Sequence, residues 1–361
     1  SGHGTGITLK EMGDMRLVLI GQQAFGKAVL EALLERDENV IAVYCAPERE
    51  GGRLDPLKEA AVKHKLPLLQ PASYKDSEVW QVFADMKPDL GVMAFVTLFV
   101  PEDFLTIPTN GTIQYHPSLL PRHRGPSSIN WPIIQGAEKT GLSIFWPDNG
   151  LDTGPILLQK EVEVAENDTL GSVYFDKLFP IGVEAMLEAV DLVRAGNAPK
   201  IEQNDSLKTY ESWCRKADVE IDWTKAVADV HNLIRGADPA PGAWTTIDGN
   251  TVQLFESQKT GESGGAPGEV VSAGADGIVI ACDGGQVRVA RARPDGGKKV
   301  AAGEFAGRKD DNAFLILKCL FGASERFLRL GRRSLIHNPF NGDDRIIKAL
   351  ADPNGICIGK E

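Results

Sequence analysis

The sequence contains few cysteines and no long apolar run. Its five cysteines are scattered without a Cys-x-x-Cys pair, which argues against a zinc site or a disulfide framework and fits a reducing cytoplasm. The longest apolar run, residues 90–100, is too short to cross a bilayer, which takes about 20 residues. With no recognisable secretory signal, the sequence predicts a globular cytoplasmic protein without a membrane partner.

Basic charge is also in deficit. The 361-residue chain has 39 Lys and Arg against 50 Asp and Glu, and its net charge of −11 makes nucleic acid a disfavoured partner. The length allows two domains, or three at most, with a sizeable core. Residues 1–14 have the composition of an added tail ahead of a native start at Met15, so we exclude them from the fold.

Apolar runs alternate with helical patterns in the first half of the chain. The runs at 15–21 and 39–47 flank a helical pattern at 27–37, and this β-α-β order predicts a parallel sheet with a right-handed crossover. The same alternation continues to one or two helices over 170–196. The expected elements between them are helices at 57–65 and 77–87 and strands at 66–71, 89–96, 112–116 and 142–147.

The second half has a different texture. A polar stretch near 197–210 is the expected linker, and after it come a helix at 226–236 and short alternating strands separated by turn residues. Residues 257–269 have the composition of an exposed loop. These patterns predict a small antiparallel β-barrel. The expected domains are 15–205 and 206–310, followed by a tail, 311–361, that we leave unassigned.

Two short motifs resemble known functional motifs but lack residues that those functions require. The first strand leads into Gly21-Gln22-Gln23-Ala24-Phe25-Gly26, which lacks the second glycine of a dinucleotide-binding fingerprint and has no Gly-Lys-[Ser/Thr] for a phosphate loop. A packing turn is the better interpretation. Asp-Thr-Gly at 152–154 occurs once, whereas aspartic protease chemistry needs two carboxylates that share a proton.

His116 and Asp152 are the strongest candidate pair. Gln114 and His116 share one face of a strand, and open α/β sheets place ligands at the carboxyl edge of such strands. Asp152 follows the strand at 142–147, and two strands that end at the same edge would bring both side chains together. A histidine with a carboxylate partner is a tuned acid or base, although the spacing equally fits a structural histidine that bonds a loop backbone. His123, between two arginines, better fits a solvated basic loop.

Two longer segments carry a resemblance to a known family. "YHPSLLPRHRGPSSINW" (115–131) and "TGLSIFWPDNGLDTGPILLQK" (140–160) resemble the 10-formyltetrahydrofolate-dependent formyltransferases and hydrolases, with the closest look to the N-terminal hydrolase domain of 10-formyltetrahydrofolate dehydrogenase. The likeness runs from Met15 to about residue 307. It implies a Rossmann-like formyltransferase domain with a parallel central sheet, followed by a small OB-like β-barrel.

The resemblance also assigns roles to single residues. The family's catalytic set is Asn-x-His with a later Asp, which maps to His116 and Asp152, but Gln114 stands where the family has Asn. His116 would stabilise a tetrahedral oxyanion or move protons, Asp152 would orient His116 or activate water, and Gln114 would donate its amide to the oxyanion. Arg122 and Arg124 would face the glutamate tail or an anionic acceptor. No metal is implied. The expected folate-binding residues are Met93, Ala94, Phe95, Val96, Leu98, Ser118, Asp148, Asn149, Gly150 and Leu151.

Three activities are compatible with this resemblance. The first is hydrolysis of 10-formyltetrahydrofolate to formate and tetrahydrofolate. The second is formyl transfer to an amine acceptor, either methionyl-tRNA or an amino sugar; the acidic charge and the run "PSSINWPI", where methionyl-tRNA enzymes have an Ala-Ala-Pro-Ile-type run, disfavour tRNA. The third is a folate-binding module without turnover, against which the retained His116 and Asp152 argue.

Overall fold

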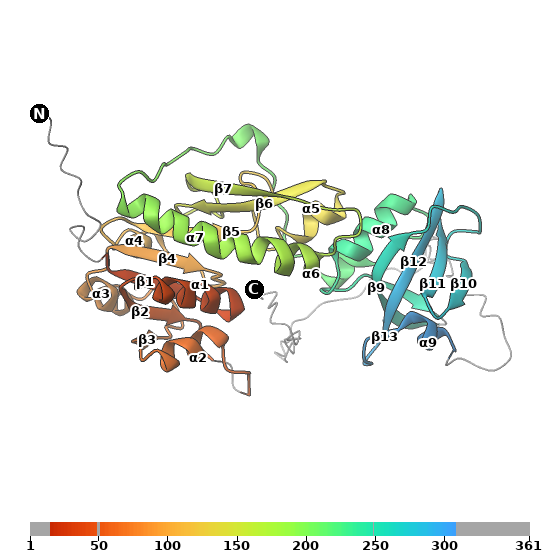
Figure 1. Cartoon of the computed structure of the whole chain (residues 1–361), viewed down its shortest axis with the longest axis horizontal. Coiled ribbons are helices and arrows are strands. Elements are labelled where there is room, and N and C mark those ends of the chain that lie inside the picture. Colours follow the sequence, from red (N-terminus) through yellow and green to blue (C-terminus); the bar gives the residue numbers. More distant parts are fainter. Residues whose placement is uncertain (1–14, 49–50, 248, 308–361) are drawn as a thin grey trace, which may run out of the picture. The chain divides into compact units, whose positions relative to one another are not determined.

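The computed structural model describes residues 15–48, 51–247 and 249–307 (Figure 1). Contacts within the chain divide it into two units, with the boundary between Cys214 and Arg215. The expected added tail and the unassigned C-terminal tail lie outside the described residues. Of the helices within the described ranges, none combines the length and the apolar character that a bilayer crossing requires.

The first unit is built on one mixed sheet. Its described strands have the order β3-β2-β1-β4-β5-β6-β7. The pairings among β1 to β5 are parallel, which confirms the predicted parallel sheet, whereas β6 pairs antiparallel with both β5 and β7. The strands are β1 (Leu17–Gly21), β2 (Val40–Cys45), β3 (Leu68–Leu69), β4 (Leu90–Ala94), β5 (Thr112–His116), β6 (Lys139–Phe145) and β7 (Ile156–Glu163).

Helices cover this sheet and follow the predicted apolar spacing (Figure 1). In α1, for example, Phe25, Val29 and Leu33 recur on one face and are buried. The segment predicted as one or two helices over 170–196 contains α6, a π-helical turn η1 and α7. The helices are α1 (Gln23–Glu35), α2 (Pro56–Lys63), α3 (Ser77–Asp85), α4 (Glu102–Leu105), α5 (Asn130–Ile134), α6 (Leu170–Ser172), η1 (Val173–Leu178) and α7 (Phe179–Arg194).

Two hydrophobic cores lie on opposite faces of the sheet. One contains Ile113 and Tyr115 of β5 together with buried residues of α1 and α7. The other is rich in aromatic rings, among them Phe83 and Phe104, whose rings stack at a centroid distance of 4.2 Å. Because strand side chains alternate between faces, the burial of Ile113 and Tyr115 in one core turns Gln114 and His116 to the other side.

The second unit is an antiparallel sheet with two helices in its described part. Its strands follow the order β10-β11-β12-β9-β8, and β13 pairs with β12. The predicted hairpins are present as β8–β9 and β11–β12. The OB-like barrel remains a prediction. The elements are α8 (Val227–Gly236), β8 (Trp244–Ile247), β9 (Asn250–Lys259), β10 (Val270–Gly274), β11 (Gly277–Cys282), β12 (Gly285–Pro294), β13 (Val300–Ala301) and α9 (Ala302–Gly307), preceded by the 3-10 turn η3 (Lys216–Val219).

Residues 199–214, which we call the strap, belong to the first unit, although the expected linker lay near 197–210. Ile201 and Ile156 exchange backbone hydrogen bonds of 2.9 and 2.8 Å. Near the other end, the Cys214 N–H donates to Ser127 Oγ at 2.9 Å. The strap contains the 3-10 turn η2 (Asp205–Leu207). Its backbone polar groups therefore find partners on the sheet unit, which a free linker would leave to water.

The aromatic core generates the first prediction. Phe83→Ala removes a fully buried ring and is expected to lower the free energy of unfolding by about 3–5 kcal/mol in urea denaturation. Val82→Ala is the matched control on the same helix, since Val82 is 43% exposed and its truncation should change stability by about 0.5 kcal/mol or less. Equal effects of the two substitutions would contradict the assignment of this core.

Candidate active site

The structure brings the side chains of His116 and Asp152 together. His116 Nδ1 lies 3.6 Å from Asp152 Oδ1, and both side chains are 8% exposed. The reason that we gave for their proximity is wrong, because β6 runs antiparallel to β5 and the two strands end at opposite edges. Asp152 is instead delivered by the loop between β6 and β7, which closes on itself through a hydrogen bond from the Trp146 N–H to the Pro155 carbonyl.

A backbone carbonyl fixes the orientation of the His116 ring. His116 Nε2 lies 3.0 Å from the carbonyl oxygen of His123. Because a carbonyl can only accept, Nε2 carries the proton of this hydrogen bond, and Nδ1 is the nitrogen that faces Asp152. The distance of 3.6 Å is longer than a direct hydrogen bond, and catalytic contacts are often this loose before the substrate binds. The Nδ1 edge is thus the edge of the ring that faces the carboxylate.

Asp152 is held from its own side by the loop after β5. Its Oδ2 accepts a hydrogen bond of 2.9 Å from the Gly125 N–H, so Oδ1 is the oxygen directed to His116. Gly125 has φ +108°, and a Cβ there would lie 2.4 Å from the Glu211 carbonyl oxygen. Only glycine can therefore bring its N–H to this position without strain.

Gln114 offers an uncommitted amide two residues before His116. It pairs with Met93 of β4 and Phe145 of β6 through the backbone, and its side chain is partly exposed. Within the described residues, that amide makes no hydrogen bond. Gln114 and His116 share one face of β5, as the alternation predicted. An amide in this position can donate to a ligand oxygen without first breaking a protein contact.

The predicted folate-binding residues after β4 line the edge of the sheet mainly with backbone. Met93 and Ala94 are buried in the sheet. Phe95 has φ +61° and packs into one core, while Val96 and Leu98 pack partly against the other. The chain therefore crosses the sheet edge here, and backbone groups are what it presents to a flat polar ring.

The second predicted folate-binding segment, residues 148–151, is tied to the chain after β4. The Glu102 N–H donates to Asn149 Oδ1 at 3.2 Å, and Asn149 Nδ2 donates to Glu102 Oε2 at 2.6 Å. Asp148 Oδ1 shapes the turn by accepting from the Gly150 N–H and from Thr153 Oγ1. Leu151 is 54% exposed. The structure thus ties one of the two segments that the resemblance assigned to folate to the start of α4, four residues beyond Leu98 of the other segment.

Ser118 has a place inside the loop after β5. It is fully buried, and its hydroxyl donates to the carbonyl of Arg122 at 2.8 Å. Its carbonyl accepts from Ser143 Oγ on β6 at 2.7 Å. To donate to a ligand, the Ser118 hydroxyl would have to give up this hydrogen bond, whereas its oxygen could still accept one.

His123 is not part of a solvated basic loop. Its side chain is 15% exposed, and Nδ1 lies 3.1 Å from Glu211 Oε1 of the strap. Burial lowers the pKa of His123, and the Glu211 carboxylate partly offsets this by raising it. His123 has φ +55°, which turns its carbonyl towards His116. The solvated interpretation failed because its partner lies 88 residues away in sequence.

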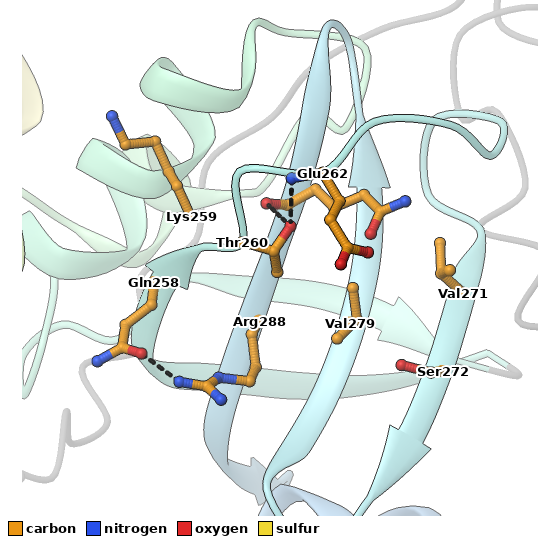
Figure 2. Close-up of a pocket in the computed structure, with 9 residues that line it drawn as sticks. Gln258, Lys259, Thr260, Glu262, Val271, Ser272, Val279 and Arg288 are labelled. Carbon is orange, nitrogen blue, oxygen red and sulfur yellow. Dashed lines mark hydrogen bonds between the residues drawn. The ribbon is translucent and has the colours of Figure 1, made fainter.

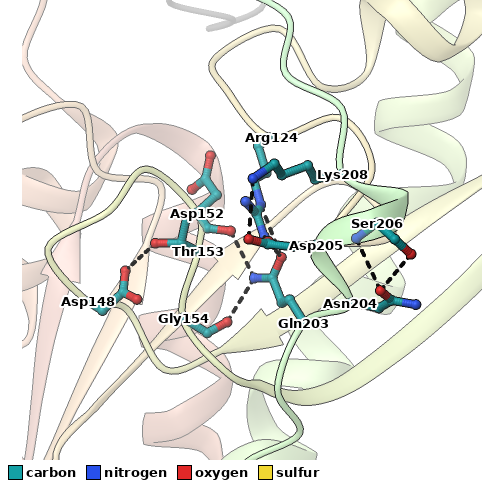
Figure 3. Close-up of polar contacts among 10 residues, drawn as sticks. All are labelled: Arg124, Asp148, Asp152, Thr153, Gly154, Gln203, Asn204, Asp205, Ser206 and Lys208. Atoms are coloured by element: carbon teal, nitrogen blue, oxygen red, sulfur yellow. Dashed lines mark hydrogen bonds and ion pairs between the residues drawn. The ribbon is translucent and has the colours of Figure 1, made fainter.

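The sequence did not point to the strap as part of the site. Gln203 donates to the carbonyls of Asp152 and Gly154, and buried Arg124 contacts Gln203 and Asp205 (Figure 3). These contacts hold the loop that carries Asp152. Arg124 is thereby engaged within the protein, whereas Arg122 is exposed and remains compatible with an anionic ligand. A polar stretch without periodicity gives no signal for such contacts.

The second unit has a pocket of about 400 Å³ on strands β9 to β12 (Figure 2). Its lining carries both signs of charge, with Lys259, Arg288 and Glu262, and Arg288 already bonds Gln258. None of the predicted site residues lines this pocket. The predicted site residues all lie in the first unit. Among the described residues, no cluster of three His, Cys, Asp or Glu side chains is arranged to hold a metal ion.

Comparison with known proteins identifies the family of both units. Residues 15–190 match the formyl transferase family model and residues 214–309 match its C-terminal domain. The mitochondrial 10-formyltetrahydrofolate dehydrogenase of Homo sapiens is 40% identical over 305 residues, which cover 81% of this chain and 33% of that protein. The chain thus spans about a third of the length of this relative. A methionyl-tRNA formyltransferase of Geotalea uraniireducens is 36% identical over 82% of this chain and 96% of its own.

A solved structure shares the fold. HypX from Aquifex aeolicus, in complex with tetrahydrofolic acid, superposes with a TM-score of 0.61 at 19% identity, over 82% of this chain and 47% of that one. At this identity the likeness concerns the fold alone. The family match covers both described units, and the methionyl-tRNA formyltransferase is matched along nearly its whole length. This chain therefore belongs to the formyl transferase family.

Proposed function

We propose that the protein hydrolyses 10-formyltetrahydrofolate to formate and tetrahydrofolate at the edge of β5. The observation that carries the proposal is the buried pair of His116 and Asp152, with the uncommitted amide of Gln114 on the same strand face. A 10-formyltetrahydrofolate dehydrogenase at 40% identity supports the folate substrate. The resemblance implies an Asn where this chain has Gln114, and it implies that the hydrolase branch also departs from Asn there, which supports hydrolysis.

The proposed reaction uses Asp152 as the base and His116 and Gln114 as hydrogen-bond donors. Asp152 Oδ1 accepts a proton from water while the water oxygen forms a bond to the formyl carbon. The formyl oxygen becomes an oxyanion, which the amide of Gln114 stabilises together with the imidazolium form of His116, in which Nδ1 as well as Nε2 carries a proton. Collapse of this intermediate breaks the bond between carbon and N10, and N10 takes the proton that Asp152 received. Formic acid and tetrahydrofolate leave, the formic acid ionises to formate by losing its proton to solvent, and the Asp152 carboxylate is restored.

A transferase is the second candidate. It is supported by the match to a methionyl-tRNA formyltransferase along 96% of that enzyme. In this case an amine of the acceptor replaces water as the nucleophile, and the same residues stabilise the oxyanion. The net charge of −11 favours a small amine, such as an amino sugar, over tRNA. The third candidate is a module that binds folate without turnover. Binding alone would not require the buried pair of His116 and Asp152.

The first test is turnover without an acceptor. Incubated with 10-formyltetrahydrofolate alone, the protein is expected to release tetrahydrofolate, and His116→Ala should lower kcat by about 10²- to 10⁴-fold because the oxyanion loses its donor. His64→Ala is the control, since His64 is exposed at the end of α2 and should leave kcat unchanged. Turnover that requires an amine would contradict the hydrolase proposal and support a transferase. Tight binding of the folate without any turnover would support a binding module.

Gln114 provides a separate test of the oxyanion site. Gln114→Ala removes a donor from the developing charge and is expected to lower kcat by about 10²- to 10³-fold without a loss of stability, because the side chain makes no hydrogen bond among the described residues. The kcat of Gln114→Asn should lie between those of Gln114→Ala and the wild type, because the Asn amide is one methylene closer to the main chain. A kcat for Gln114→Ala close to the wild-type value would remove Gln114 from the mechanism.

A further inference from the structure

The main chain at Asp152 adopts a conformation that needs outside support. Its φ of +56° lies in the left-handed region, which costs a non-glycine residue about 1–3 kcal/mol. The residue is also the tip of a loop, and the carboxylate must stay within reach of His116. A residue of this kind persists only where its surroundings hold both the side chain and the backbone. The Gly125 N–H holds the Asp152 side chain. The Asp152 backbone needs a second contact.

Gln203 holds that backbone from the strap. Its Nε2 donates to the carbonyls of Asp152 and Gly154, each at 2.8 Å, and so bridges the turn from both sides (Figure 3). The loop therefore has two anchors: one on the Asp152 carboxylate and one on its main chain. Both anchors come from segments that are distant in sequence, and neither uses a group that the proposed reaction consumes.

Arg124 fixes the direction of the Gln203 amide. Arg124 Nε and Nη2 donate to Gln203 Oε1 at 3.1 and 2.7 Å, so the amide nitrogen must face the loop. The guanidinium is buried, and Asp205 accepts from its Nη2 at 2.9 Å. This contact holds the pKa of Asp205 below its usual value. Arg124 is followed by Gly125, so one short segment fixes both anchors of Asp152.

The strap is itself fixed on both sides of Gln203. Before it, Ile201 pairs with Ile156 at the start of β7. After it, the Arg124 N–H donates to the Thr209 carbonyl at 3.1 Å, and the Glu211 N–H donates to the Arg124 carbonyl at 3.2 Å. Gln203 is therefore a rigid support and not a side chain on a free loop.

We propose that Gln203 is a positioning residue, which sets the orientation of the Asp152 carboxylate through the main chain of its loop. The consequence for catalysis rests on the proposed function, in which Asp152 exchanges a proton with water. The consequence for structure does not: loss of the amide donors releases the turn, and the hydrogen bond from the Gly125 N–H to Asp152 weakens with it.

The sharpest variant is Gln203→Glu. It keeps the side-chain volume and the contact with Arg124 but removes both N–H donors and sets carboxylate oxygens against two carbonyls. We expect kcat for hydrolysis of 10-formyltetrahydrofolate to fall about 10- to 100-fold, with KM nearly unchanged. Gln258→Glu is the matched control, because it makes the same change at an exposed glutamine that accepts from an arginine, Arg288, in the second unit, and kcat should remain at the wild-type value.

A second readout does not depend on turnover. Hydrogen exchange of the Gly125 amide, followed by NMR, should become faster in Gln203→Glu and stay unchanged in Gln258→Glu, while the amides of β1 keep their protection in both variants. Unchanged exchange at Gly125 in Gln203→Glu overturns the inference, whatever the enzyme does. A wild type without turnover, combined with faster Gly125 exchange in the variant, would refute the proposed function and leave the structural coupling intact. Turnover in the variant equal to that of the wild type overturns the positioning role.

Discussion

The hydrogen bond from the Gly125 N–H to Asp152 Oδ2 joins the two loops on which the site depends. One loop follows β5 and fixes the His116 ring through the His123 carbonyl, and the other carries the carboxylate. Neither loop can move without changing the separation of His116 Nδ1 and Asp152 Oδ1. Glycine is required for this contact because any side chain at residue 125 would meet the Glu211 carbonyl.

The two ring nitrogens of His116 have different roles. Nε2 donates to a backbone carbonyl, which fixes the ring and leaves Nδ1 to face the carboxylate and, in the proposed reaction, the formyl oxygen. Asn149, in one of the two segments assigned to folate, is tied to Glu102 of α4, the helix that follows the other segment. Pre-organised donors of this kind cost no reorganisation when charge develops.

The fold was largely predictable because strands β1, β2 and β4 are continuous apolar runs separated by helical periodicity. β7 and β10 were missed: only the first two residues of β7 are buried, and β10 is mostly exposed. For the site, spacing alone left His116 open between two interpretations, and the family resemblance decided in favour of catalysis. The strap could not be predicted, since Gln203 acts through backbone carbonyls, which leave no pattern in the sequence.

The most direct measurement of the central claim is a crystal structure of the protein with a formylated tetrahydrofolate bound. The account predicts the formyl oxygen within hydrogen-bond distance of His116 and the Gln114 amide, with the pterin edge paired to backbone groups of residues 93–98. A folate bound elsewhere on the chain, or in a pose that leaves the formyl group remote from His116 and Asp152, would contradict it.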